Sequence, residues 1–354
     1  MTVRALLSSL GERLPVPDAL TRAVIQGFVG RTNRLLKVEG ENTADFAEGM
    51  KTYRIAEHTD AANRQHYEVP AAMFEKALGK RLKYSSCLYP RPGMSLDEAE
   101  EVALAETCAH AKLEDGQDVL ELGCGWGSLT LWMAEHYPNS RITAVSNSAS
   151  QRAFIEARAA ERGFGNVRII TADANEFEPD GKVDRIVSVE MFEHMSNWRE
   201  LFTRLRSWLK PDGLLFAHFF AHRQSPYRFD EGDGSDWIAQ HFFTGGIMPS
   251  EHLASHFPDL FSVDEQWWWS GTHYARTARH WLENYDRHID AIVPVLKETY
   301  GADWRLWLRR WRLFFLATEG LFGHAGGEVW GVVHVRLKPA AIANDGANGG
   351  SGAK

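Results

Sequence analysis

Two carboxylates and an imidazole come together in the short stretch "VEMFEHM", residues 189–195. Glu190 and Glu193 are three positions apart, and Glu190 and His194 are four apart. If the chain turns helically here, the three side chains cluster. Two carboxylates held close raise the pKa of one of them, so the cluster could take a proton from a cationic substrate near neutral pH, with His194 relaying it. The competing interpretation is that Glu190 only binds a ligand and that His194 is a structural histidine.

A glycine-rich stretch, "ELGCGWGSL" at 121–129, offers a ligand close access to the backbone. Gly123, Gly125 and Gly127 have the spacing G-x-G-x-G, and Ser128 stands where the dinucleotide fingerprint G-x-G-x-x-G has its last glycine. The acidic residue expected after the second strand is replaced by "SNSASQ". Both departures count against a nicotinamide dinucleotide, and a plain tight turn remains the alternative to a binding site.

A sheet must position these residues, because the chain changes to alternating strands and helices after residue 117. The runs that read as strands are "DVLELG", "RITAVS", "VRIITAD", "DRIVSVE" and "GLLFAHFF". The first four are linked through helical segments such as "SQRAFIEARAAERG". This rhythm predicts an α/β fold with a doubly wound, mostly parallel sheet covered on both faces.

The order of these features resembles that of S-adenosylmethionine-dependent methyltransferases of class I, with their seven-stranded Rossmann-like sheet. Asp173 ends the third strand, where a carboxylate can accept a hydrogen bond from an adenine amino group. The ligand is a sulfonium without phosphate, which favours carboxylates and aromatic rings nearby. The resemblance implies S-adenosyl-L-methionine as the cofactor, held at Gly123, Gly125, Asp173, Ala174 and Glu190.

Helical segments flank the predicted sheet. Residues 1–80 are expected to form an N-terminal helical extension, in which a polar stretch, "EGENTADFAEGMKTYR", separates two helices. Residues 81–338 should form the methyltransferase domain, with substrate-cap insertions at 222–250 and 272–322 and a helix starting at Ser95. Most of the 13 tryptophans lie beyond residue 230, which predicts an aromatic-rich helical cap. Residues 339–354 are expected to be a disordered tail.

Two tryptophan-rich stretches allow two interpretations each. The run Trp267–Trp269 is expected on a late strand with alternate rings on opposite faces, as core packing or as a wall for a cation. The helix "DWRLWLRRWRLFFLATEGLF" has one aromatic face with arginines off it. It could lie on a membrane surface, but a buried aromatic face suits the acidic chain better.

Composition excludes several classes. A net charge of -8 and a pI near 6.0 argue against nucleic-acid binding. The three cysteines form no CxxC pair, which predicts no metal site and a reducing, cytoplasmic setting. The start of the chain is too polar for a secretory signal, and no apolar run is long enough to predict stable membrane insertion. The sequence leaves a homodimer open.

The flanking motifs narrow the resemblance. The stretches "KYSSCLY", "LGCGWGSL", "VSNSASQ", "EMFEHM" and "HYARTARHWLEN" together look like the cyclopropane-fatty-acid synthase superfamily, over roughly residues 80–337. The short loop "EHMSNW", the long insertion "HRQSPYRFDEGDGSDW" and the C-terminal pattern look more like the coclaurine-type (benzylisoquinoline) N-methyltransferases than the lipid enzymes.

This resemblance implies further site residues. Tyr84 and Ser85 would cover the methionine part of the cofactor, and Ser146, Asn147 and Gln151 would take the ribose. His218, expected at a strand end, and Tyr274, expected at a helix start, would line the pocket with Glu193; in the lipid enzymes such groups hold a bicarbonate that acts as the base. Without the resemblance, both residues would be read as packing residues.

Two departures from the superfamily pattern concern possible thiols. Ser86 and Thr318 stand where relatives often have cysteine. Neither residue supports a thiol nucleophile.

Three functions follow from these observations. The leading one is N-methylation of a small cyclic or aromatic-bearing amine, in which the base removes the proton of the ammonium. The second is a lipid enzyme that methylates or cyclopropanates an acyl double bond. The third is a module that senses S-adenosylmethionine without turnover, against which the acid–base cluster speaks.

Overall fold

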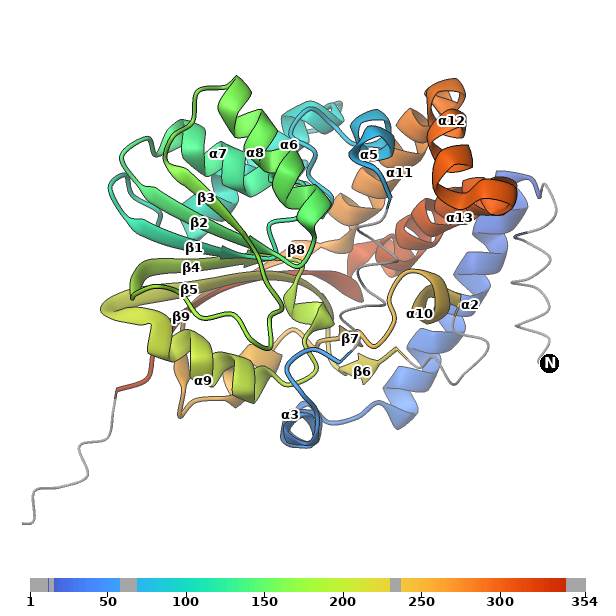
Figure 1. The fold of residues 1–354 in the computed structure, drawn as a ribbon. Coiled ribbons are helices and arrows are strands. Elements are labelled where there is room, and N and C mark those ends of the chain that lie inside the picture. The colour runs from blue at the N-terminus through green and yellow to red at the C-terminus, as the bar shows by residue number, and fades with distance from the viewer. Residues whose placement is uncertain (1–11, 13–15, 58–68, 230–236, 342–354) are drawn as a thin grey trace, which may run out of the picture.

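A seven-stranded sheet in the order β3-β2-β1-β4-β5-β9-β8 forms the centre of the molecule (Figure 1). The computed structural model describes residue 12 and residues 16–57, 69–229 and 237–341. The strands of the sheet are β1 (Asp118–Leu122), β2 (Arg141–Ser146), β3 (Val167–Thr171), β4 (Val183–Val189), β5 (Leu209–His222), β8 (Phe261–Ser270) and β9 (Trp330–Pro339). The first five pair in parallel, and β9 lies antiparallel between β5 and β8. The mostly parallel, doubly wound class I sheet is thus confirmed.

Helices cover both faces of the sheet. The first face carries α6 (Leu96–His110), α7 (Ser128–His136) and α8 (Ala149–Glu161), and α9 (Trp198–Trp208) lies on the second (Figure 1). Leu104 of α6 and Trp132 of α7 pack with Val187 of β4 in one core. Trp198 of α9 packs in another with Leu215 of β5. Ser95 and Glu98 form the predicted capping box at the start of α6.

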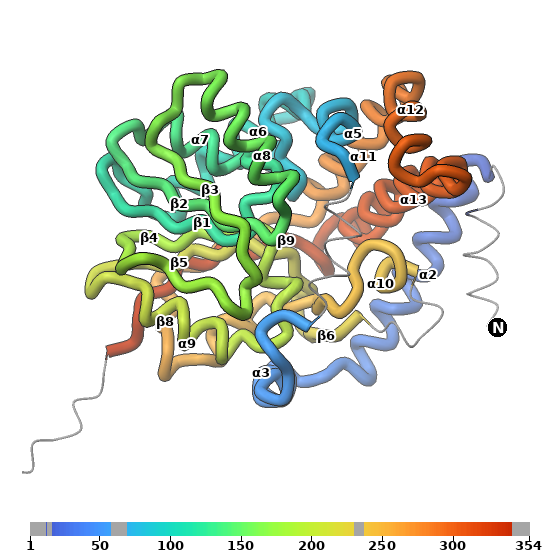
Figure 2. The backbone as a smooth tube through the Cα atoms, in the orientation of Figure 1, coloured from blue at the N-terminus to red at the C-terminus, as the bar shows by residue number. Residues whose placement is uncertain are grey.

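A helical cap stands beside the carboxyl ends of the parallel strands. It consists of α11 (Gly271–Arg287), α12 (Ile289–Tyr300) and α13 (Trp304–Phe322), joined by α2 (Asp18–Glu39) and α5 (Ala71–Ala77). Helix α2 runs along α13, on the side of the molecule away from β3 (Figure 2). Trp311 and Phe315 of α13 are buried, whereas Arg312 forms ion pairs with Asp18 and Asp286. This is the aromatic-rich cap that the tryptophans predicted. A second arginine of α13, Arg310, forms an ion pair with Glu12.

Several details differ from the expectations. The polar stretch between the first helices contains α3 (Thr43–Gly49), whose Phe46 is buried against the second face. Strand β5 begins at Leu209, earlier than the run "GLLFAHFF" suggested, and His218 lies inside it, opposite His334. The inserted segment 222–250 contains β6 (Tyr227–Arg228), α10 (Trp237–His241) and β7 (Ile247–Met248), and its residues 230–236 lie outside the described residues, as do 1–11, 13–15 and 342–354.

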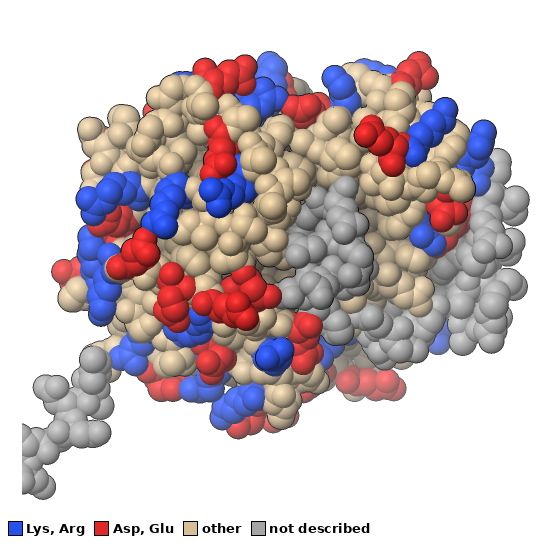
Figure 3. Space-filling model, viewed as in Figure 1, with Lys and Arg blue, Asp and Glu red and all other residues tan. Residues whose placement is uncertain are grey.

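The surface mixes both signs of charge. On the face drawn in Figure 3, basic and acidic side chains are scattered in small groups among other residues. Among the described residues, no helix is both long enough and apolar enough to cross a bilayer.

Candidate active site

The glycine turn after β1 provides a cradle for a ligand. Gly123, Gly125 and Gly127 have φ angles of 78°, 51° and 80°, which side-chain-bearing residues rarely adopt. A Cβ atom on Gly123 would lie 2.7 Å from Met191, and one on Gly127 would lie 2.7 Å from Ile155. A Cβ atom on Gly125 would meet nothing within 4 Å, because this glycine faces an open cleft. The turn therefore fits a ligand that lies on the backbone.

The cleft has two halves that share Gly123, Gly125 and Gln151. The sheet half follows the ends of β2 and β3 and is lined by residues that include Ser146, Asn147, Ala172, Ala174 and Phe177. The cap half lies under the helical cap and is lined by residues that include Tyr84, Ser85, Glu190, Phe220, Phe229, Phe243, Tyr274, Phe314, Thr318 and Phe322. His194 lines both halves.

Short local hydrogen bonds organise the sheet half. Ser146 Oγ donates to Gln151 Oε1 at 2.7 Å and accepts from the N–H of Ser148 at 3.0 Å. Asp173 Oδ1 accepts from the N–H of Asn175 at 2.7 Å and from its side-chain amide at 2.8 Å. Asp173 is absent from the described residues that line the cleft, although both of its neighbours in the chain line it. In this structure the side chain of Asp173 therefore stabilises its own loop through its hydrogen bonds to Asn175.

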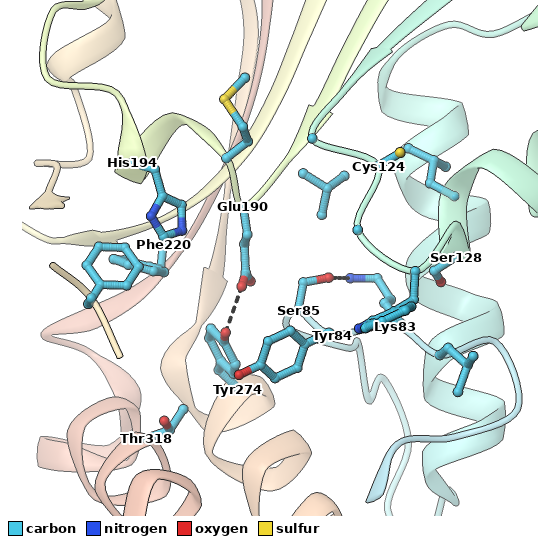
Figure 4. Close-up of a pocket in the computed structure, with 18 of the residues that line it drawn as sticks. Lys83, Tyr84, Ser85, Cys124, Ser128, Glu190, His194, Phe220, Tyr274 and Thr318 are labelled. Carbon is cyan, nitrogen blue, oxygen red and sulfur yellow. Dashed lines mark hydrogen bonds between the residues drawn. The ribbon is translucent and has the colours of Figure 1, made fainter. Parts of the chain in front are cut away.

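Glu190 is the centre of the cap half. It has a left-handed φ of 47°, a strained conformation for a residue with a side chain, at the point where the chain leaves β4. Its Oε2 accepts from the Tyr274 hydroxyl at 2.7 Å, and its Oε1 accepts from the N–H of Ser86 at 2.8 Å. His218 Nε2 lies 3.2 Å from the same Oε1. Figure 4 shows the Glu190 carboxylate and the Tyr274 hydroxyl meeting inside the pocket.

Glu193 and His194 diverge after β4, on a short 3-10 turn at Phe192–His194. Glu193 is fully buried, and the N–H of Phe220 donates to its Oε1 at 2.6 Å. Burial, and then the nearby Glu190 carboxylate, raise the pKa of Glu193 well above its ordinary value. Tyr274 lines the cleft as predicted, but neither Glu193 nor His218 is among the described residues that line it, because both are buried behind Glu190. His218 and Tyr274 contact the Glu190 carboxylate and not that of Glu193. The His194 ring faces the pocket next to Phe243.

Sequence reasoning did not single out Lys83 or the phenylalanines of the cap half. Lys83 is 1% exposed, and its ammonium donates to Ser85 Oγ at 2.5 Å and to the Ser86 carbonyl at 2.6 Å. Burial lowers the pKa of Lys83. Its position directly before "YSSC" was a usable signal. The phenylalanines come from β5, from α13 and from the connecting segments that hold Phe229 and Phe243, and they carried no such signal.

The tryptophan run lies on β8 and does not line the cleft among the described residues. Trp267 stacks on His110, Trp268 packs under Arg223, and Trp269 packs beside His334. Alternate rings do face opposite sides, as predicted.

A family model described as mycolic acid cyclopropane synthetase matches residues 55–320. The chain belongs to this family. Within it, the chain is 36% identical over 299 residues to an (S)-coclaurine N-methyltransferase of Thalictrum flavum subsp. glaucum, covering 83% of each protein. It is 29% identical to a cyclopropane-fatty-acyl-phospholipid synthase of Escherichia coli (strain K12), over 77% of this chain and 67% of the synthase.

A solved coclaurine N-methyltransferase, bound to N-methylheliamine and SAH, superposes with a TM-score of 0.88 at 34% identity, covering 94% of this chain and 98% of that one. These findings confirm the N-methyltransferase branch of the cyclopropane synthetase family. They also confirm the S-adenosylmethionine-dependent methyltransferase activity and its cofactor. The glycine turn after β1 and the polar residues at the end of β2 fit this cofactor.

Proposed function

We propose that the protein transfers a methyl group to the nitrogen of a small cyclic, tetrahydroisoquinoline-like amine. The observation that carries this proposal is the composition of the cap half: the Glu190 carboxylate lines the same space as the rings of Phe220, Phe229, Phe243 and Phe322. An ammonium on an aromatic framework needs both, because the carboxylate pairs with its charge while the rings accept its apolar body.

The cofactor would be held along the shared floor of the cleft. Gly123 and Gly125 would lie against it, Ser146, Asn147 and Gln151 would take its ribose, Asp173 and Ala174 would border its adenine, and Tyr84 and Ser85 would cover its methionine part. When bound, S-adenosylmethionine supplies an electrophilic methyl group. The remaining chemistry falls to the side chains of the cap half.

The three residues of the predicted acid–base cluster have different roles, because they lie in different places around the pocket. A substrate ammonium pairs with Glu190, which takes its proton: an N–H bond breaks, an O–H bond forms, and the nitrogen keeps the electron pair. His194 faces the same space and orients the amine or shares the proton. Glu193 lies behind them and supports the strand end through the N–H of Phe220. Tyr274 and His218 hold the Glu190 carboxylate in place.

A panel assay with labelled cofactor tests the substrate class. The panel contains tetrahydroisoquinolines, simple amines and unsaturated phospholipids, each assayed from pH 6 to 10 with and without bicarbonate. We expect methylation of the tetrahydroisoquinolines, and His194→Ala should lower turnover mainly at neutral pH, with partial recovery at alkaline pH where solvent deprotonates the ammonium. Bicarbonate-dependent product on phospholipid would replace this proposal with the lipid function.

We also propose a cytoplasmic setting, which the cysteines support. Cys87, Cys108 and Cys124 are all buried free thiols, which supports a reducing cytoplasm. Burial raises the pKa of Cys108 to about 12, which does not favour a reactive thiolate. A homodimer with two equivalent pockets remains a prediction, which light scattering can test by measuring the molar mass in solution.

A further inference from the structure

A row of histidines leads away from Glu190. His218 Nε2 lies 3.2 Å from Glu190 Oε1, and His218 Nδ1 lies 2.8 Å from His334 Nε2. His334 Nδ1 lies 2.8 Å from His110 Nδ1, and His110 Nε2 lies 3.0 Å from Glu106 Oε1. His218 and His334 are fully buried, whereas the Glu106 side chain is 44% exposed. The row therefore connects the pocket carboxylate to the surface.

Three neighbouring strands and one helix build this row. His218 of β5 and His334 of β9 are directly opposite partners in the antiparallel ladder, so their side chains share one face of the sheet. His218 is also the partner of Val189, the residue before Glu190. Helix α6 brings His110 and Glu106, one turn apart, over the same face. The contacts thus follow from strand register and helical spacing.

Aromatic rings line the row. Trp267 stacks on His110 with ring centres 3.6 Å apart and planes within 5°. The Trp269 ring centre lies 4.0 Å from that of His334 and 5.6 Å from that of His218. Residues two apart in a strand face the same side, which explains why the first and third tryptophans of the run flank the histidines. These apolar walls leave the histidines to bond with one another.

The row has one more hydrogen bond than its neutral histidines can supply with donors. Five groups, two carboxylates and three imidazoles, make four hydrogen bonds, but three neutral imidazoles supply only three N–H donors. A fourth proton completes the row. It can sit on Glu190, with every ring donating toward Glu106, or on Glu106, with every ring donating toward Glu190. Moving each of the four protons by one bond exchanges these states: the O–H bond at Glu190 breaks, one forms at Glu106, and each histidine stays neutral with its N–H on the other nitrogen.

We propose that Glu106, His110, His334 and His218 form a proton relay that carries the proton released by N-methylation from Glu190 to the surface. This proposal rests on the proposed function, in which Glu190 takes the proton of a substrate ammonium inside a filled pocket. The relay residues act through Glu190 and touch no substrate, so they are positioning residues for its proton.

The surroundings favour neutral imidazoles. Burial lowers the pKa of His218 to about 4, and it lowers the pKa values of His334 and His110 as well. The charged groups that face the row are Lys83 and Glu190 near His218, Lys83 near His334, and Glu106, Glu265 and Arg336 near His110.

Turnover of His110→Gln tests the relay, because glutamine keeps hydrogen bonds but cannot take up one proton and release another. We expect steady-state methylation to fall about tenfold, less than the roughly 10²–10⁴-fold of a group that exchanges a proton with the substrate directly, because these residues act only through Glu190. The first turnover should keep its rate, because the relay acts only after Glu190 has taken the substrate proton. Added imidazole should restore turnover by carrying the proton away. The control is His136→Gln, since His136 also stacks on a tryptophan ring but lies outside the row. Unchanged turnover, or an equal loss in the first turnover without rescue, would overturn the relay.

A second measurement needs no substrate. Nitrogen-15 NMR of the ligand-free protein reports which ring nitrogen of each histidine carries the proton. His110→Gln should shift the tautomer balance of His218, two residues along the row, and His136→Gln should not. If wild-type protein methylates no amine, the proposed function fails. The NMR comparison still decides whether the histidines of the row exchange protons with one another. A His218 tautomer that is the same in both variants would overturn the relay.

Discussion

The two halves of the cleft are built in opposite ways. The polar edge of the sheet half comes from short turns that follow consecutive strands, where Ser146 bonds to Gln151 and Asp173 bonds to Asn175 over five and two positions. One bond of this edge is long-range, since the N–H of Ala56 donates to Asn175 across 119 positions. The cap half joins distant segments: Ser86 and Tyr274 meet at Glu190 across 104 and 84 positions. A ligand shared by many enzymes needs only the local construction, whereas a substrate pocket depends on the tertiary arrangement of the whole chain.

The largest effect should come from Gly125→Val. The position has a φ of 51°, and its Cβ would point into the open cleft, so the substitution adds backbone strain and fills the space of the ligand. We expect cofactor binding to be abolished in calorimetry. Gly163→Val is the control, since Gly163 has a φ of 71° and open space but lies outside the cleft. Wild-type affinity in Gly125→Val would remove the glycine turn from the site.

Asp173→Ala should weaken cofactor binding by about 1–3 kcal/mol, the cost of a lost charged hydrogen bond. Because Asp173 also holds Asn175, the matched variant Asn175→Ala separates the two roles. A direct contact predicts a larger rise of the dissociation constant in Asp173→Ala than in Asn175→Ala. Equal rises would show that Asp173 acts only through its loop.

A substitution in the cap half should change substrate binding without changing the affinity for the cofactor. Thr318 faces the cavity from α13 with its hydroxyl bonded to the Phe314 carbonyl. Thr318→Phe fills the cavity, and we expect KM for a bulky amine to rise about tenfold, roughly the discrimination that a crowded apolar pocket gives, with unchanged cofactor affinity. Thr299→Phe is matched, because Thr299 makes the same type of bond on α12 outside the cleft. A parallel loss of cofactor affinity would mean that the halves are not separable.

The last prediction concerns the pH dependence of stability and involves neither half of the cleft directly. The raised pKa of Glu193 means that the folded protein binds a proton which the unfolded chain releases above its ordinary pKa. Its stabilising contribution is present at low pH and is lost as pH rises toward the folded pKa. Wild type should therefore lose stability relative to Glu193→Gln by up to about 1.4 kcal/mol per pH unit. Urea unfolding between pH 4.5 and 8 measures this difference. A difference that does not change with pH would contradict a buried, protonated Glu193.

The same contrast explains what the sequence could predict. The alternation of strands and helices fixed the parallel sheet, and the glycines and "SNSASQ" located the sheet half, because these signals are local. The gathering of His218 and Tyr274 at Glu190 was not predictable, since it depends on where α11 packs and on the left-handed turn at Glu190. Spacing alone suggested that Glu190, Glu193 and His194 act as one cluster. The turn at 192–194 instead directs Glu193 into the core and His194 into the pocket.

The position of β9 has a consequence for how the chain reaches its native state. This strand is made after β8 but is inserted between β5 and β8, pairing with a segment more than a hundred residues earlier. Neither β8 nor the helical cap can dock fully until it arrives. Such long-range pairings slow folding, and until they form, the open edge of β5 is exposed to association with other chains. We therefore expect the parallel half of the sheet to form early and the enzyme to become competent in one late step, when β9 closes the gap.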